Sequence, residues 1–100
     1  MFGLPDQTLV LLKAYFAKQA ELKEVWVYGS RAMDTYRPGS DIDLAIVTTP
    51  TSDLSAHIKS DLEDLPTPYT FDVIDYNRIS HPPLIAHINR VKKLMYAKNK

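Results

Sequence analysis

The sequence predicts a small α/β (α+β) domain, with a mixed β-sheet of about three or four strands and helices packed mainly on one face. Apolar residues recur at helical spacing in three segments of the chain. Three short runs rich in β-branched and aromatic residues lie between these segments. This alternation is typical of helices packed on a small sheet. With 100 residues, the chain has the length of one domain, so we predict a single domain spanning 1–100.

The first half of the chain contains two predicted strands. Residues 5–23 have helical periodicity, with Asp6 as the expected N-cap after Pro5. The run "EVWVYG" predicts a strand that stops at Gly29, and residues 30–36 predict a short helix or turn. A second strand is predicted at "DIDLAIVT", which begins with two aspartates.

The second half is predicted to add two helices and a third strand. Residues 52–65 form a helix that Pro66 ends, and "YTFDVIDY" forms the strand. Pro82 and Pro83 favour the first turn of a final helix. Its apolar stripe consists of Leu84, Ile85, Ile88, Val91 and Met95. We interpret the basic end, "RVKKLMYAKNK", as a solvated helix terminus, the alternative being a contact surface.

The composition excludes several classes of function. Twelve basic and twelve acidic residues give no net charge, so direct nucleic-acid binding through a broad basic face is not expected. Local groups remain sufficient for a nucleotide. No cysteine is present, which excludes disulfides and thiolate metal sites. We see no signal peptide and no apolar run of about 20 residues, so we predict a soluble, cytoplasmic protein without membrane contact.

Two aspartates at the start of the second strand are candidate metal ligands. Side chains alternate along a strand, so Asp41 and Asp43 point to one face while the apolar residues between and after them point to the other. Two close carboxylates repel and raise each other's pKa. Mg²⁺ or Mn²⁺, which prefer oxygen ligands, would relieve this repulsion. On the third strand, Asp72 is the preferred third ligand, whereas Asp75 precedes a turn and is expected to cap it.

The Gly29–Ser30 pair is a candidate phosphate-binding turn. Gly29 lets the chain turn sharply and approach a phosphate, and Ser30 offers a hydroxyl and an N–H group. Arg31 and Arg37 are near enough in sequence to contact a phosphate or a carboxylate. Three carboxylates beside such a turn suit phosphoryl or nucleotidyl transfer with two metal ions.

Each feature taken alone has a simpler interpretation. The aspartates and the Gly-Ser pair are common in turns and caps. The two arginines are equally consistent with surface ion pairs. Tyr28 and Trp26 are most simply strand packing, and the histidines His57, His81 and His87 show no metal-ligand spacing and are interpreted as surface or packing residues. The combination favours a site, because independent turns do not require a third aspartate within a later strand.

The stretch "GSRAMDTYRPGSDIDLAIV" resembles the signature of the DNA polymerase β-type nucleotidyltransferase superfamily: Gly-Ser, a ten-residue spacer, then Asp-x-Asp. The short chain and the later "FDVIDY" resemble the minimal nucleotidyltransferases (MNT), which are often encoded beside a helical HEPN-domain partner. The resemblance implies that Gly29 and Ser30 bind nucleotide phosphates. It also implies that Asp41, Asp43 and Asp72 are metal ligands and catalytic residues, with Asp72 helping to activate the attacking hydroxyl.

The resemblance also implies an activity. We expect a Mg²⁺-dependent enzyme, with two ions, that transfers AMP from ATP, or another nucleoside monophosphate, to a hydroxyl. The expected acceptor is a tyrosine of a HEPN-domain toxin, for which this chain would be the antitoxin, in a homodimer or hetero-oligomer. One alternative is a non-catalytic antitoxin that occludes the partner. Another is a nucleotidyltransferase for small molecules such as antibiotics.

Overall fold

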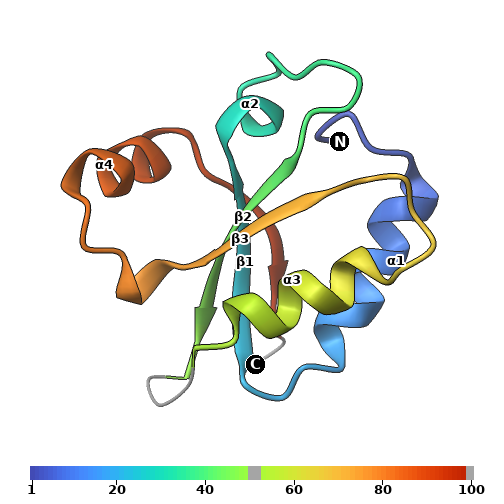
Figure 1. The fold of residues 1–100 in the computed structure, drawn as a ribbon, viewed down its shortest axis with the longest axis horizontal. Helices are drawn as coiled ribbons and strands as arrows, with labels where there is room; N and C mark the ends of the chain where they lie inside the picture. Colours follow the sequence, from blue (N-terminus) through green and yellow to red (C-terminus); the bar gives the residue numbers. More distant parts are fainter. Residues whose placement is uncertain (50–52, 99–100) are drawn as a thin grey trace.

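Four strands form the sheet at the centre of the molecule, in the order β3-β2-β1-β4 (Figure 1). The computed structural model describes residues 1–49 and 53–98. Strand β1 (Leu22–Tyr28) pairs antiparallel with both β2 (Ile42–Thr48) and β4 (Lys93–Ala97). Strand β3 (Phe71–Asp75) pairs parallel with β2. The predicted mixed sheet and fold class are therefore confirmed.

Helices cover both faces of this sheet. Helices α1 (Asp6–Ala17) and α3 (Ser55–Glu63) lie on one face, and α4 (Pro82–Val91) lies on the other (Figure 1). The short α2 (Gly29–Ala32) follows β1 directly, and a 3₁₀ turn, η1 (Tyr76–Arg78), follows β3. Among the described residues, no helix is both long enough and apolar enough to cross a bilayer.

Side chains alternate between the two faces of the sheet along each strand, and each face has its own hydrophobic core. The larger core lies under α1 and α3 and contains Ile42, Leu44 and Ile46 of β2, all fully buried. The smaller core lies under α4, where Ile88 packs with Ala45. Asp43 lies on the face opposite the larger core, which is the arrangement that period-two alternation predicts.

The N-terminal helix is shorter than its periodicity predicts. It ends at Ala17 rather than near residue 23, and Ala20, the last member of the predicted apolar stripe, is exposed. From Leu22 the chain instead forms a strand that pairs with β2. The helix begins at Asp6 itself, with Pro5 at the N-cap position and no side-chain cap. The predicted cap at Asp6 is therefore wrong.

The third helix also differs slightly from its prediction. It begins at Ser55 and ends at Glu63, within the predicted range 52–65, while Ser52 lies outside the described residues. Its buried side chains, Ile58 and Leu62, are members of the predicted apolar stripe. The prediction for this helix is therefore correct in its packing face and too long at its ends.

The C-terminal segment is a strand, not the solvated end of a helix. The final helix stops at Val91, and Lys93–Ala97 pair with β1 as the edge strand β4. Met95, which the helical periodicity places on the stripe of the final helix, is 4% exposed and packs in the larger core from this strand. A short apolar run fits either helix or strand by periodicity alone. The free edge of β1 decides the outcome, because β4 satisfies its backbone groups.

We predict that substitutions on the two faces of β4 will differ in their effect on stability. Met95→Ala removes a buried side chain and is expected to lower the free energy of unfolding by about 2–5 kcal/mol. Leu94→Ala is the matched control, because Leu94 is 45% exposed, and we expect a change within about 0.5 kcal/mol. Urea denaturation of both variants provides the measurement. Equal losses would contradict the strand assignment.

Candidate active site

Three polar side chains form a row across three adjacent strands, at the end of β1. Tyr28 is the register partner of Asp43, and Asp43 is the register partner of Asp72. Side chains of register partners in neighbouring strands lie on the same face, about 5 Å apart at Cβ. The sheet therefore brings together two of the predicted carboxylates, Asp43 and Asp72, from strands that are separated in the sequence by α3.

Asp41 lies beside this row, at the residue before β2 begins. The hydroxyl of Thr70 donates a hydrogen bond to Asp41 Oδ1. Asp41 and Asp72 are exposed, whereas Asp43 is half-buried. The structure thus places all three predicted aspartates at one end of the β2–β3 pair, with Asp43 innermost.

The negative charges in the row are unfavourable for the protein in the absence of a bound cation. Burial raises the pKa of Asp43 above its ordinary value, and the negative charges of Asp72 and Asp41 raise it further. The pKa of Tyr28 is also raised, first by burial and then by Asp72 and Asp43. Within the described ranges, the ion pairs involve other acidic residues, namely Asp61, Glu63 and Asp75. The three carboxylates of the site therefore hold negative charge that no basic side chain of these ranges neutralises by direct contact.

Gly29 closes one side of the site. Its φ is +68°, and a Cβ added to it would overlap Asp43 Oδ2 and lie 3.2 Å from Asp43 Cγ. The backbone of the turn is thus packed directly against the carboxylate, an approach that only glycine permits. Ser30 follows in the first turn of α2 and is half-buried. The Gly-Ser pair and the aspartates, which the sequence predicts to act together, are neighbours in space.

The donor set suits a divalent cation that is shared with a ligand. No group of three or more His, Cys, Asp or Glu in the described parts of the chain is arranged to hold a metal ion by itself. Mg²⁺ usually keeps several waters and binds through one or two carboxylates plus substrate phosphates. The adjacent, uncompensated Asp43 and Asp72 fit that mode. Asp41 lies at the rim, with one oxygen engaged by Thr70.

Arg31, a predicted phosphate ligand, is buried and makes structural contacts. Its side chain is 3% exposed. The guanidinium donates hydrogen bonds to the carbonyls of Phe2 at 3.0 Å and Ser40 at 3.1 Å, and it lies over the rings of Tyr36 and Tyr69. Arg31 therefore fixes the connection between α2 and β2 to the N-terminal segment, and its role toward a nucleotide stays a prediction.

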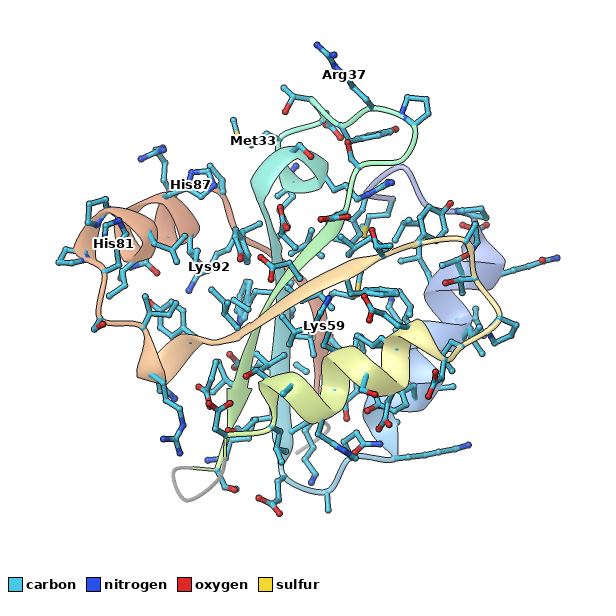
Figure 2. All side chains as sticks on the ribbon, in the orientation of Figure 1. Met33, Arg37, Lys59, His81, His87 and Lys92 are labelled. Carbon is cyan, nitrogen blue, oxygen red and sulfur yellow. The ribbon has the colours of Figure 1, made fainter. Side chains whose placement is uncertain are left out.

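Arg37 is likewise not brought to the aspartates. It is exposed, and Figure 2 shows its side chain extending away from the sheet at the far end of the connection between α2 and β2. Its backbone N–H donates to Ser40 Oγ at 2.8 Å, which stabilises the "RPGS" turn. The structure thus offers no support for Arg37 as a phosphate ligand.

For two residues at the site, the sequence alone indicates only packing or surface roles. Tyr28 belongs to the row itself, and His87 of α4 contacts Tyr28 edge-on, with ring centroids 6.2 Å apart. Strand alternation would identify Tyr28 if the pairing of β1 with β2 were known in advance. No sequence signal identifies His87, because its position depends on how α4 packs.

Asp75 has the role predicted for it. Its side chain is buried on the face opposite Asp72 and accepts a hydrogen bond from the backbone N–H of Asn77 at 3.1 Å, which caps η1. It also pairs with Arg78 at 3.2 Å. The choice of Asp72 over Asp75 as the third carboxylate agrees with this geometry.

The family is established by sequence. The model of the polymerase beta nucleotidyltransferase family matches residues 11–100, and the chain belongs to this family. A search of curated proteins finds no match. The nucleotidyltransferase family and fold that the sequence motif predicts are confirmed.

Solved structures of toxin–antitoxin complexes contain chains with the same fold. One complex with AMP-PNP superposes with a TM-score of 0.72 at 19% identity, covering 96% of this chain and 76% of that chain. Another is a Shewanella oneidensis complex of a tri-AMPylated HEPN toxin with an MNT antitoxin, with a TM-score of 0.64 at 18% identity. It covers 98% of this chain and 74% of that one. At these identities, the likeness concerns the fold.

We predict that a methyl group at Gly29 will disrupt the site. Gly29→Ala places a Cβ against Asp43 and strains a positive φ, so we expect a loss of about 2–4 kcal/mol in unfolding free energy and of nucleotide binding. Gly39→Ala is the matched control, because Gly39 has φ +86° but nothing lies within 4 Å of a Cβ added there, and it should lose only about 1–2 kcal/mol. Denaturation and nucleotide titration would measure both; equal effects would contradict the contact.

We also predict that removing a carboxylate charge will stabilise the metal-free protein. Asp43→Asn removes a charge whose burial, together with repulsion from Asp72 and Asp41, raises the pKa of Asp43. We expect a gain of about 1 kcal/mol, or about 4–8 °C in melting temperature. Asp53→Asn is the control, for which we expect the opposite change. Hydrogen bonds from Ser55 lower the pKa of Asp53, so the melting temperature of this variant should fall. Scanning calorimetry in EDTA at neutral pH measures both. A lower melting temperature for Asp43→Asn would contradict charge repulsion at the site.

Proposed function

We propose that this chain is a minimal nucleotidyltransferase that transfers AMP from ATP to a hydroxyl of a HEPN-domain toxin, and that it thereby acts as an antitoxin. The observation that carries the proposal is the row of Tyr28, Asp43 and Asp72 across three strands, with the Gly29 backbone against Asp43. Membership of the polymerase beta nucleotidyltransferase family supports the reaction class. The solved complexes that share the fold support the kind of partner.

Each residue of the site has a role in this reaction. Gly29 and Ser30 would bind the triphosphate through the turn, and Asp41, Asp43 and Asp72 would hold Mg²⁺, for which Mn²⁺ could substitute. When bound, two such ions stabilise the charge that develops on the attacking and leaving oxygens. Asp43 is the innermost ligand, because it is half-buried and fixed between Gly29 and Asp72.

The transfer itself is a displacement at the α-phosphorus. The acceptor oxygen forms a bond to this phosphorus, the bond to the β-phosphate oxygen breaks, and pyrophosphate leaves. The proton of the acceptor hydroxyl passes to a base, and Asp72 is our candidate, because it is exposed on the edge strand β3 beside Asp43. A tyrosine of a partner protein can reach Asp72 from solvent, whereas the more buried Asp43 is shielded by the turn.

One observation favours a second candidate, in which the chain neutralises its partner by occlusion alone. The described residues contain no ready-made group of three metal ligands, and Asp41 is engaged by Thr70. A chain that had lost turnover would tolerate such an arrangement. The two candidates differ in whether the carboxylates are needed for neutralisation.

We predict that the chain labels its HEPN partner when incubated with [α-³²P]ATP and Mg²⁺. Asp43→Asn should lower the rate of labelling by at least about 100-fold, because it removes charge at the position that holds the metal. Lys13→Ala, an exposed change on α1, should leave the rate unchanged. Labelling that persists in an Asp41→Ala plus Asp43→Ala variant would overturn the proposal.

The same approach distinguishes catalysis from occlusion. A variant with Asp41, Asp43 and Asp72 all changed to alanine is expected to bind the partner but to leave its toxicity intact in a growth assay. Full neutralisation by this variant, with the complex intact on gel filtration, would identify occlusion as the mechanism.

A further inference from the structure

Two basic side chains of α4, His87 beside the row and Arg90 in contact with His87, have no part in the roles assigned above. His87 contacts the ring of Tyr28 edge-on, and Tyr28 is the register partner of Asp43. Arg90 lies one turn further along the helix, with Nη2 3.4 Å from His87 Nδ1. Figure 2 shows His87 at the part of α4 that approaches α2 and Met33.

The contact with Arg90 determines how the imidazole can bind a ligand. A guanidinium has only hydrogen-bond donors, so the Nδ1 that it contacts must accept. The neutral ring then carries its hydrogen on Nε2, which is a donor. His87 and Arg90 together thus present donors and a positive charge, the combination that binds phosphate oxygens.

The other basic side chains near the site have partners outside the row, although Asp72 and Asp41 also contribute, after Glu63, to the raised pKa of Lys59. Lys59 of α3 donates to Glu63 at 2.9 Å and to the carbonyl of Phe71 at 2.6 Å. Lys92 lies over the ring of Trp26, with Nζ 4.6 Å from its centroid. Arg31 is buried in the connection that it fixes. Arg90, by contrast, is exposed, and its guanidinium contacts the imidazole of His87.

We propose that His87 and Arg90 bind the β- and γ-phosphates of the nucleoside triphosphate, with Tyr28 positioning the imidazole. This inference rests on the proposed nucleotide site. The Gly29–Ser30 turn begins α2, and α4 contacts α2 (Figure 1). A triphosphate held by the turn would extend its terminal phosphates toward α4, where His87 and Arg90 provide the donors. These two residues take the place that Arg31 and Arg37 were predicted to fill.

The test compares the binding of ATP and AMP to the full chain by calorimetric titration with Mg²⁺. His87→Ala and Arg90→Ala should each weaken ATP binding by about tenfold, since each removes a hydrogen bond to a charged group. AMP lacks the β- and γ-phosphates, so its affinity should change less than about twofold. The double variant should lose less than the product of the single losses, because Arg90 orients His87. His81→Ala is the matched control: this exposed histidine precedes the same helix, and its loss should alter neither affinity.

The outcomes separate this inference from the proposed function. Equal losses for ATP and AMP, or no loss in the Arg90→Ala variant, would overturn the inference while leaving nucleotidyl transfer standing. Wild-type protein that binds ATP with the expected dependence on His87 and Arg90, but labels no HEPN partner, would support the inference and overturn the function. Circular dichroism and melting curves check that His87→Ala folds, and the exposed Arg90→Ala gives an independent result if it does not. A wild type that binds neither nucleotide overturns the inference.

Discussion

The pairing of β2 with both of its neighbours is the constraint on which the site depends. Its antiparallel contact with β1 sets Tyr28 beside Asp43, and its parallel contact with β3 sets Asp72 on the other side. A slip of one residue in either register would move a side chain of the row to the opposite face. The buried residues that alternate with the row, such as Ile42 and Leu44, oppose such a slip, because it would expose them. The hydrophobic core therefore fixes the relative positions of the charged groups.

The same arrangement brings like charges together, which destabilises the folded protein. Asp43 is held half-buried between a glycine backbone and a second carboxylate, and its pKa is raised as a result. Like charges held together in this way destabilise the protein by itself and stabilise it only when a cation or a positively charged partner binds. This trade of stability for binding is typical of functional sites.

The parts of the site that are local could be predicted from the sequence. Gly29 and Ser30, and Asp41 and Asp43, are positioned by a turn and by strand alternation, and both can be inferred from neighbouring residues. Asp72 required the further assumption that its strand lies next to β2, which the structure confirms. Arg31 could not be assigned in this way, because whether an arginine faces a phosphate or a set of backbone carbonyls depends on tertiary packing.

The strand that pairs with the edge of β1 could not be predicted from local sequence either. The segment Lys93–Ala97 follows a helix and has a composition that suits either state, and its pairing with a strand far earlier in the chain decides the outcome. His87 is a second case. It reaches the site only because α4 packs against the smaller core through Ile88, which no local pattern around His87 indicates.

Strand β3, which carries Asp72, lies at one edge of the sheet. Strand β3 has five residues and pairs with β2 alone, while β1, β2 and β4 form a continuous antiparallel unit. A local opening of β3 would remove Asp72 from the row and leave that unit paired. Such an opening would cost the packing of Phe71 and Val73 in the larger core, yet it would leave the three antiparallel strands paired. Opening of β3 and unfolding of the whole chain are in this sense separate events, and amide exchange in β3 would measure the first.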